Sequence, residues 1–140
     1  LFFYDSHHKK RFYLLWSGSK ENTLSRLPNY AATVFLLSAD EKLWEKTRRQ
    51  MSDTGIYFNQ VRLGSVTLEQ YILFHAAKDA YHGTKHIRLS ELTDRELVPD
   101  EILRLIVNAF VIERYGMDIV EQKMCEEILE ERNYTVLAQS

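Results

Sequence analysis

The clearest hydrophobic pattern in the chain runs from Pro99 to Gly116, PDEILRLIVNAFVIERYG. Pro99 suits the first position of a helix, where its missing N–H would have no partner, and Gly116 suits a left-handed C-terminal cap. At about 100° per residue, the apolar side chains between them cover most of the helix circumference. A helix that is apolar on nearly all sides is normally surrounded by other elements. We therefore predict that helix 99–115 is the central buried helix of the fold.

Shorter amphipathic stretches with capping residues predict the other helices. Pro28 opens one of them. Ser38 and Glu41 have the S-x-x-E spacing of a capping box, which predicts a break near Ser38 and a new helix after it. Thr67 and Gln70 have the spacing of a second capping box. The predicted helices cover residues 6–16, 28–37, 39–51, 67–82, 99–115 and 117–131.

The predicted helices form a single all-α domain over residues 1–140, a bundle of about six helices with helix 67–82 packed against helix 99–115. A length of 140 residues fits one domain. A hydrophobic content of 45% and a charged content of 27% are ordinary for a globular chain, so the core needs no disulfide or structural metal.

Residues 56–63, IYFNQVRL, do not fit the helical pattern. They form either a minor β-hairpin around Asn59-Gln60 or an irregular stretch whose apolar side chains fill the core. We favour the irregular stretch, because Asn-Gln lacks the glycine that a tight hairpin turn prefers. The remaining connections are a loop, a segment with short helical turns and a C-terminal tail, over residues 17–26, 84–98 and 134–140.

The charge balance narrows the range of partners. The formal net charge of −2 gives no broad attraction to nucleic acid or to anionic lipid, so nucleic-acid binding is not expected. A membrane span needs roughly 20 apolar residues, and Arg104, Asn108 and Glu113 interrupt the most apolar stretch. We therefore expect no association with a membrane.

Cysteine usage and the N-terminus point to the cytoplasm. Cys125 is the only cysteine, which excludes an internal disulfide and fits a reducing compartment. It lies beside an apolar helix stripe and is expected to be a small buried residue rather than a nucleophile. The opening LFF is too short for the apolar region of a signal peptide. The basic run that follows, His7-His8-Lys9-Lys10-Arg11, is predicted to be the solvated face of the first helix.

One polar cluster could carry chemistry. His75, Asp79 and His82 are spaced i, i+4, i+7 on helix 67–82, and His86 follows just past Gly83. Imidazole and carboxylate at this spacing can share a divalent metal, and a carboxylate can also orient a histidine for acid–base catalysis. The spacing is no established signature, however. We therefore favour partly buried histidines that are hydrogen-bonded to Asp79, to backbone or to water, with a metal site as the alternative.

The turn Gly83-Thr84-Lys85-His86, with Lys78 nearby, could also bind an anion. Anion sites usually lie at a helix N-terminus, whereas this turn follows a C-terminus, so we favour a capping role. The chain has no Walker loop, no G-x-G-x-x-G, no H-E-x-x-H and no G-x-S-x-G. The sequence thus assigns no catalytic residue and predicts no cofactor.

Three stretches, YAATVFLLSADEKLW (30–44), AAKDAYHGTKHIRLSEL (76–92) and RLIVNAFVIERYG (104–116), resemble an uncharacterised family of small proteins common in prophages and other mobile elements of Gram-positive bacteria. The resemblance implies a bacterial cytoplasm and a mobile-element origin, and it implies no activity. Within the middle stretch the match to the family includes Asp79 and His86, whereas His75 and His82 are not part of the family pattern.

The functional expectation is a non-enzymatic accessory protein that binds a protein partner, with a homodimer as one form. It predicts a helical face with more exposed apolar residues than the core requires. The alternative is a small metal-dependent, hydrolase-like enzyme that uses the face formed by His75, Asp79 and His82.

Overall fold

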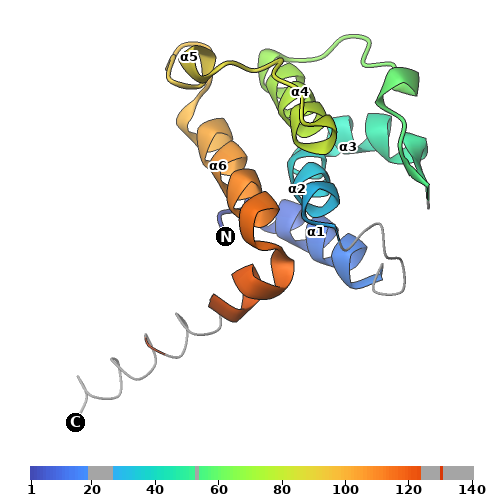
Figure 1. Ribbon diagram of the computed structural model, residues 1–140. Coiled ribbons are helices and arrows are strands. Elements are labelled where there is room, and N and C mark those ends of the chain that lie inside the picture. Colours follow the sequence, from blue (N-terminus) through green and yellow to red (C-terminus); the bar gives the residue numbers. More distant parts are fainter. Residues whose placement is uncertain (19–26, 53, 124–129, 131–140) are drawn as a thin grey trace.

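The computed structural model describes residues 1–18, 27–52, 54–123 and 130. Within these ranges the fold is an all-α bundle with one minor two-stranded hairpin, as predicted (Figure 1). Residues 117–123 are also helical. The numbered helices are α1 (Ser6–Gly18), α2 (Pro28–Leu37), α3 (Glu41–Thr47), α4 (Leu68–His82), α5 (Leu89–Leu92) and α6 (Asp100–Tyr115). None of the described helices combines the length and the apolar character needed to cross a membrane.

The centre of the bundle is α2, and the prediction that helix 99–115 is the central buried helix is wrong. Every residue from Ala31 to Leu37 is buried, and α2 packs against α4 and α6 as well as α1 and α3. Helix α6 instead buries one face and exposes the opposite one. Its apolar residues form two stripes, one packed and one exposed to solvent. Counting how much of the helix circumference is apolar cannot tell the two stripes apart. The buried stripe consists of Ile102, Leu105, Ile106, Ala109 and Ile112.

Helix α4 begins and ends where local signals predict. The Thr67 hydroxyl accepts from the Gln70 N–H at 3.2 Å, and the Gln70 side chain accepts from the Thr67 N–H at 2.9 Å. Gly83 ends the helix in the left-handed conformation, with φ of 71°. The predicted contact between this helix and α6 is confirmed. Gln70 also donates to Asp40 at 3.0 Å, which links the start of α4 to the start of α3.

The predicted capping box at Ser38 and Glu41 is wrong, although the predicted break is present. Asp40 caps α3, and its carboxylate accepts from the Leu43 N–H at 2.9 Å. The Ser38 hydroxyl donates to the Phe35 carbonyl at 3.3 Å and so serves the last turn of α2. Aspartate is as good an N-cap as serine, and here it is the residue closer to the new helix. Helix α3 ends at Thr47 and a 3₁₀ turn, η2 (Arg48–Gln50), follows.

The minor hairpin lies upstream of the turn considered from sequence. Strands β1 (Met51–Ser52) and β2 (Gly55–Ile56) pair in antiparallel register, with Met51 opposite Ile56. Residues Phe58–Gln60 form a 3₁₀ turn, η3. Ile56 and Phe58 are buried, which confirms the interpretation of this stretch as one whose apolar residues fill the core. The Tyr81 hydroxyl, from α4, accepts from the Ile56 N–H at 3.2 Å and fixes the hairpin against that helix.

The N-terminal segment packs more deeply than the sequence suggests. Lys9 and Lys10 are exposed as predicted, but His8 is fully buried and Arg11 is half-buried. The predicted solvated basic face is therefore wrong for these two residues. Arg11 donates to the Ser38 carbonyl at 2.9 Å, while the His8 ring lies 4.8 Å from the ring of Phe35 in α2. His8 is buried and Arg11 is half-buried because they contact α2, and the local sequence pattern of α1 does not contain that information.

The remaining predictions concern the connections between helices and the C-terminal part of the chain. The 84–98 connection contains one short helix, α5, which agrees with the short helical turns predicted there. Gly116 has the predicted positive φ of 79°, but its ψ of 157° is not that of a left-handed cap. Met117 and Val120 are buried as predicted for the last helix. The rest of the 17–26 loop beyond Gly18, the end of helix 117–131, Cys125 and the tail at 134–140 lie outside the described residues.

Candidate functional site

The Asp79 carboxylate, in the last turn of α4, organises the turn that follows the helix. Its Oδ1 accepts from the Thr84 hydroxyl at 2.6 Å and from the His86 N–H at 2.9 Å, and its Oδ2 accepts from the Ile87 N–H at 2.8 Å. Burial opposes ionisation of Asp79, but the hydrogen bonds from Thr84, His86 and Ile87 outweigh burial and lower its pKa. The ionised carboxylate is therefore an integral part of this turn.

His86 forms a carboxylate–imidazole pair with Asp79. The His86 Nδ1 lies 2.7 Å from Asp79 Oδ1 and 3.1 Å from the Thr84 hydroxyl. With the proton on Nδ1, the neutral ring donates to Asp79 and leaves Nε2 as an acceptor. The His86 side chain is 44% exposed. The pair could serve acid–base chemistry, and it also completes the hydrogen bonding of the turn.

His75 lies next to His86 in a cluster of tilted and edge-on rings. Its ring centroid is 4.3 Å from that of Tyr71, 5.5 Å from that of Phe74 and 5.6 Å from that of His86. Its Nδ1 atom is buried and has no hydrogen-bond partner in the described part of the chain. Burial, followed by the positive charges of His86 and Lys78, lowers the pKa of His75. The neutral ring is thus the form that this environment favours.

The fourth candidate, His82, lies apart from the other three. Its ring packs against Phe58 at 5.6 Å and against Tyr81 at 5.0 Å between centroids. The structure therefore brings together His75, Asp79 and His86, whereas His82 packs against other aromatic residues. Across residues 1–18, 27–52, 54–123 and 130, no group of three or more His, Cys, Asp or Glu side chains is arranged to hold a metal ion.

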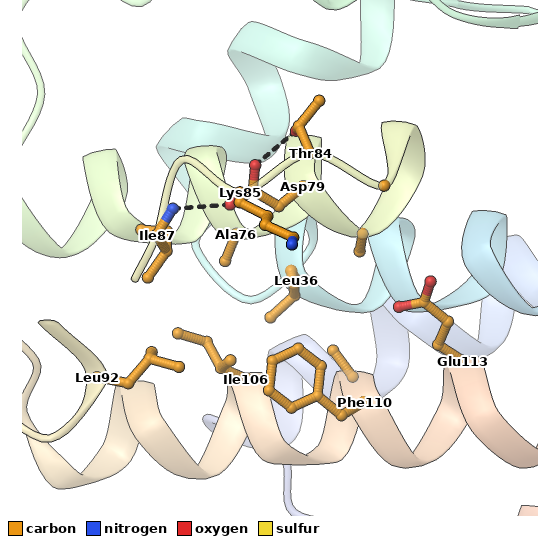
Figure 2. A pocket seen from close by; sticks show the side chains of 13 residues that line it. Leu36, Ala76, Asp79, Thr84, Lys85, Ile87, Leu92, Ile106, Phe110 and Glu113 are labelled. Carbon is orange, nitrogen blue, oxygen red and sulfur yellow. Dashed lines mark hydrogen bonds between the residues drawn. The ribbon is translucent and has the colours of Figure 1, made fainter. Parts of the chain in front are cut away.

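A cavity of about 260 Å³ lies beneath the 83–87 turn, between α4 and α6 (Figure 2). Figure 2 shows Ile106 and Phe110 of α6 on one side, Lys85 from the turn on the other, and Leu36 of α2 between them. Asp79 fixes the turn through Thr84 and Ile87, on either side of Lys85, and thereby positions the lysine. The apolar part of the cavity is lined by Leu36, Ala76, Ala80, Ile87, Leu92, Ile106, Ala109 and Phe110.

Two opposite charges stand at this cavity. Lys85 is exposed on the turn, and Glu113 is half-buried on α6. Burial raises the pKa of the Glu113 carboxyl, because water solvates the charged form only in part. In the described part of the chain, neither side chain makes a hydrogen bond or an ion pair. The cavity thus combines an apolar lining with one cation and one acid that have no partner among the described residues.

The outer face of α6 carries several large apolar side chains that are exposed to solvent. Val107 is 48% exposed and Phe110 51%, and Val111 and Tyr115 are also exposed. Leu103 lies on the same side and is half-buried. Our sequence analysis missed this surface because it counted these residues as buried. The 3-4-3-4 spacing of Asp100, Leu103, Val107, Phe110 and Arg114 was the available signal, since it describes a single stripe along a helix.

No family model matches the chain, and no curated protein and no solved structure is significantly similar to it.

Proposed function

We propose that this chain is a protein-interaction protein that self-associates through the outer face of α6. The observation that carries the proposal is the stripe formed by Asp100, Leu103, Val107, Phe110 and Arg114. Val107 and Phe110, at its middle, each expose about half of a large apolar side chain to solvent. Single exposed apolar residues are normal on protein surfaces, but a contiguous row is typical of an interface.

The charges at the ends of the stripe favour a second copy of the same chain as the partner. Asp100 and Arg114 are both exposed, and each lies seven residues from Val107 along α6. A second copy of α6 that runs antiparallel about a two-fold axis near Val107 brings each Arg114 beside the partner's Asp100. The helix rise places these pairs about 10 Å on either side of the axis. The pairing is self-complementary, as a two-fold interface requires.

The geometry of the polar cluster supports a role without catalysis. Both carboxylate oxygens of Asp79 are engaged by the turn that follows α4, and His82 is directed away from His75 and His86. The proposed setting, the cytoplasm of a bacterium that carries a prophage or another mobile element, rests on the sequence resemblance and on cysteine usage. Its test is the position of the gene. Neighbouring integrase or virion genes would support the setting, and a housekeeping operon would contradict it.

The test of self-association is the molar mass in solution, measured by sedimentation equilibrium over a range of concentrations. We expect a dimer for the wild-type chain and a monomer for Val107→Asp, because the substitution places two like charges at the two-fold axis. Leu89→Glu is the matched control, since Leu89 is 78% exposed and lies on α5. A wild-type monomer at all concentrations would refute the proposal, and so would a dimer that Val107→Asp leaves intact.

A charge exchange tests the antiparallel arrangement itself. Asp100→Arg and Arg114→Asp each place like charges together at both ends of the interface, and each should weaken the dimer by about tenfold. The double variant restores opposite charges and should recover most of the affinity. Failure of the double variant to recover, with the thermal midpoint unchanged, would exclude this arrangement.

A further inference from the structure

We propose that the cavity beneath the 83–87 turn binds a small zwitterion with an apolar body, of the class of aromatic and branched-chain α-amino acids. The ligand carboxylate pairs with Lys85, its ammonium group pairs with Glu113, and its apolar side chain lies among the alanine and isoleucine side chains of α4 and α6. The cavity shares Phe110 with the proposed dimer stripe, and its other lining residues lie outside that stripe.

The size of the cavity fits this class of ligand. One water accounts for about 30 Å³ of liquid volume, and an apolar cavity of about 150 Å³ holds benzene. A cavity of about 260 Å³ therefore accommodates one ring or one branched alkyl group together with a short polar head. It is smaller than the pockets that enclose drug-sized molecules, which begin at about 300 Å³.

Three small side chains create the hollow. Ala76 and Ala80 on α4 and Ala109 on α6 all line the cavity, and each is buried. A larger residue at any of these positions would fill the space that the ligand side chain occupies. Most of the apolar lining comes from α2, α4 and α6, so it is preformed and little ordering accompanies binding.

The two charges are positioned independently of any ligand. Lys85 lies between Thr84 and His86, which are both hydrogen-bonded to Asp79, so the backbone of the lysine is held in place. Glu113 belongs to the regular helix α6. Figure 2 shows the Lys85 ammonium group over the cavity and the Glu113 carboxylate at the α6 side of it. The ligand carboxylate accepts from Lys85 and its ammonium group donates to Glu113; such charge-assisted hydrogen bonds are stronger than neutral ones, and together they select a molecule with both charges.

The experiment is a titration of the full chain with L-phenylalanine and L-leucine, followed by calorimetry and by amide chemical shifts. Three comparison ligands each lack one feature: phenylpropionate has no ammonium group, phenethylamine has no carboxylate, and glycine has no apolar body. We expect each to bind at least about tenfold more weakly than L-phenylalanine. Absence of binding by both amino acids at 10 mM, or equal binding of phenylpropionate and L-phenylalanine, would overturn the proposal.

Variants assign the contacts. Lys85→Met and Glu113→Gln should each weaken binding of L-phenylalanine by about tenfold or more, while Lys78→Met should not, because Lys78 does not line the cavity. Ala80→Leu should abolish binding without unfolding the chain, since it fills the cavity. The thermal midpoint of each variant shows that it is folded. Unchanged affinity in folded Lys85→Met and Glu113→Gln would refute the assigned contacts and, with them, the proposal.

Discussion

The buried histidine of α1 makes the stability of the protein depend on pH in a calculable way. His8 is fully buried, and both ring nitrogens are engaged. Nδ1 accepts from the Tyr4 N–H at 3.0 Å, and Nε2 donates to the Phe35 carbonyl at 2.8 Å. Protonation would place a second donor opposite the Tyr4 N–H. Burial lowers the pKa of His8 from 6.5 to about 4; the charge of Arg11 adds to this effect, and the Phe35 carbonyl opposes it.

The sign and the size of the effect follow from linkage. Because the folded pKa lies below the unfolded one, falling pH protonates His8 in the unfolded state first. The contribution of His8 to the free energy of unfolding is therefore constant above about pH 6.5 and is lost between pH 6.5 and pH 4. At about 1.4 kcal/mol per pH unit the full loss is about 3 kcal/mol, of which about 2 kcal/mol has occurred at pH 5.

Urea denaturation at pH 7.5 and pH 5.0 measures this loss. The wild-type chain should lose about 2 kcal/mol more than His8→Gln, which cannot titrate. Subtracting the pH dependence of His8→Gln from that of the wild type cancels the contribution of His75, whose pKa is also lowered. The lowered pKa of Asp79 changes the free energy of unfolding only when the pH falls through and below about 3.8, which is outside the range of the two measurements. His7→Gln is the matched control, because His7 is exposed in the same turn. An equal pH dependence in His8→Gln and wild type would refute the reasoning.

Three further substitutions test the turn after α4 and the minor hairpin. Asp79→Asn leaves only one accepting oxygen for the hydrogen bonds of the turn. We therefore expect the free energy of unfolding to fall by about 2 kcal/mol and the amide hydrogens of His86 and Ile87 to exchange faster. Unchanged amide exchange would contradict this expectation. Gly55 has φ of 146°, and a Cβ there would lie 2.6 Å from the Tyr81 hydroxyl oxygen, so Gly55→Ala should destabilise the chain by about 1 to 3 kcal/mol in thermal unfolding. Tyr81→Phe should relieve part of that loss, and no relief would assign the whole effect to backbone strain.

The parts of the fold that could be predicted from sequence are those set by neighbouring residues. Pro28 at the start of α2, the capping box from Thr67 to Gln70 and Gly83 at the end of α4 each act through a few adjacent backbone groups. The same is true of the choice between a hairpin and an irregular stretch at 56–63, where the absence of a turn glycine was informative. Local hydrogen bonding therefore located most of the helices correctly.

The parts that failed depend on residues far away in the chain. Helices α2 and α6 are both rich in apolar residues, and only their packing partners decide that α2 is central. His8 sits in a basic run and is buried because Phe35 covers it. His75 and His82 share a helix face by spacing, yet one ring packs on Tyr71 and the other on Phe58. The identities of those partners are not contained in the spacing of the histidines.

The burial of α2 from Ala31 to Leu37 also has a consequence for synthesis on the ribosome. Its main partners, α4 and α6, are encoded later, and Ile102 of α6 follows Leu37 by about 65 residues. At about 5 to 20 residues per second, α2 is made about 3 to 13 s before α6 can cover it. During that interval its apolar surface is available to chaperones and to other nascent chains. Fragments that end before residue 100 should therefore aggregate, whereas the full chain can bury α2 as soon as α6 emerges.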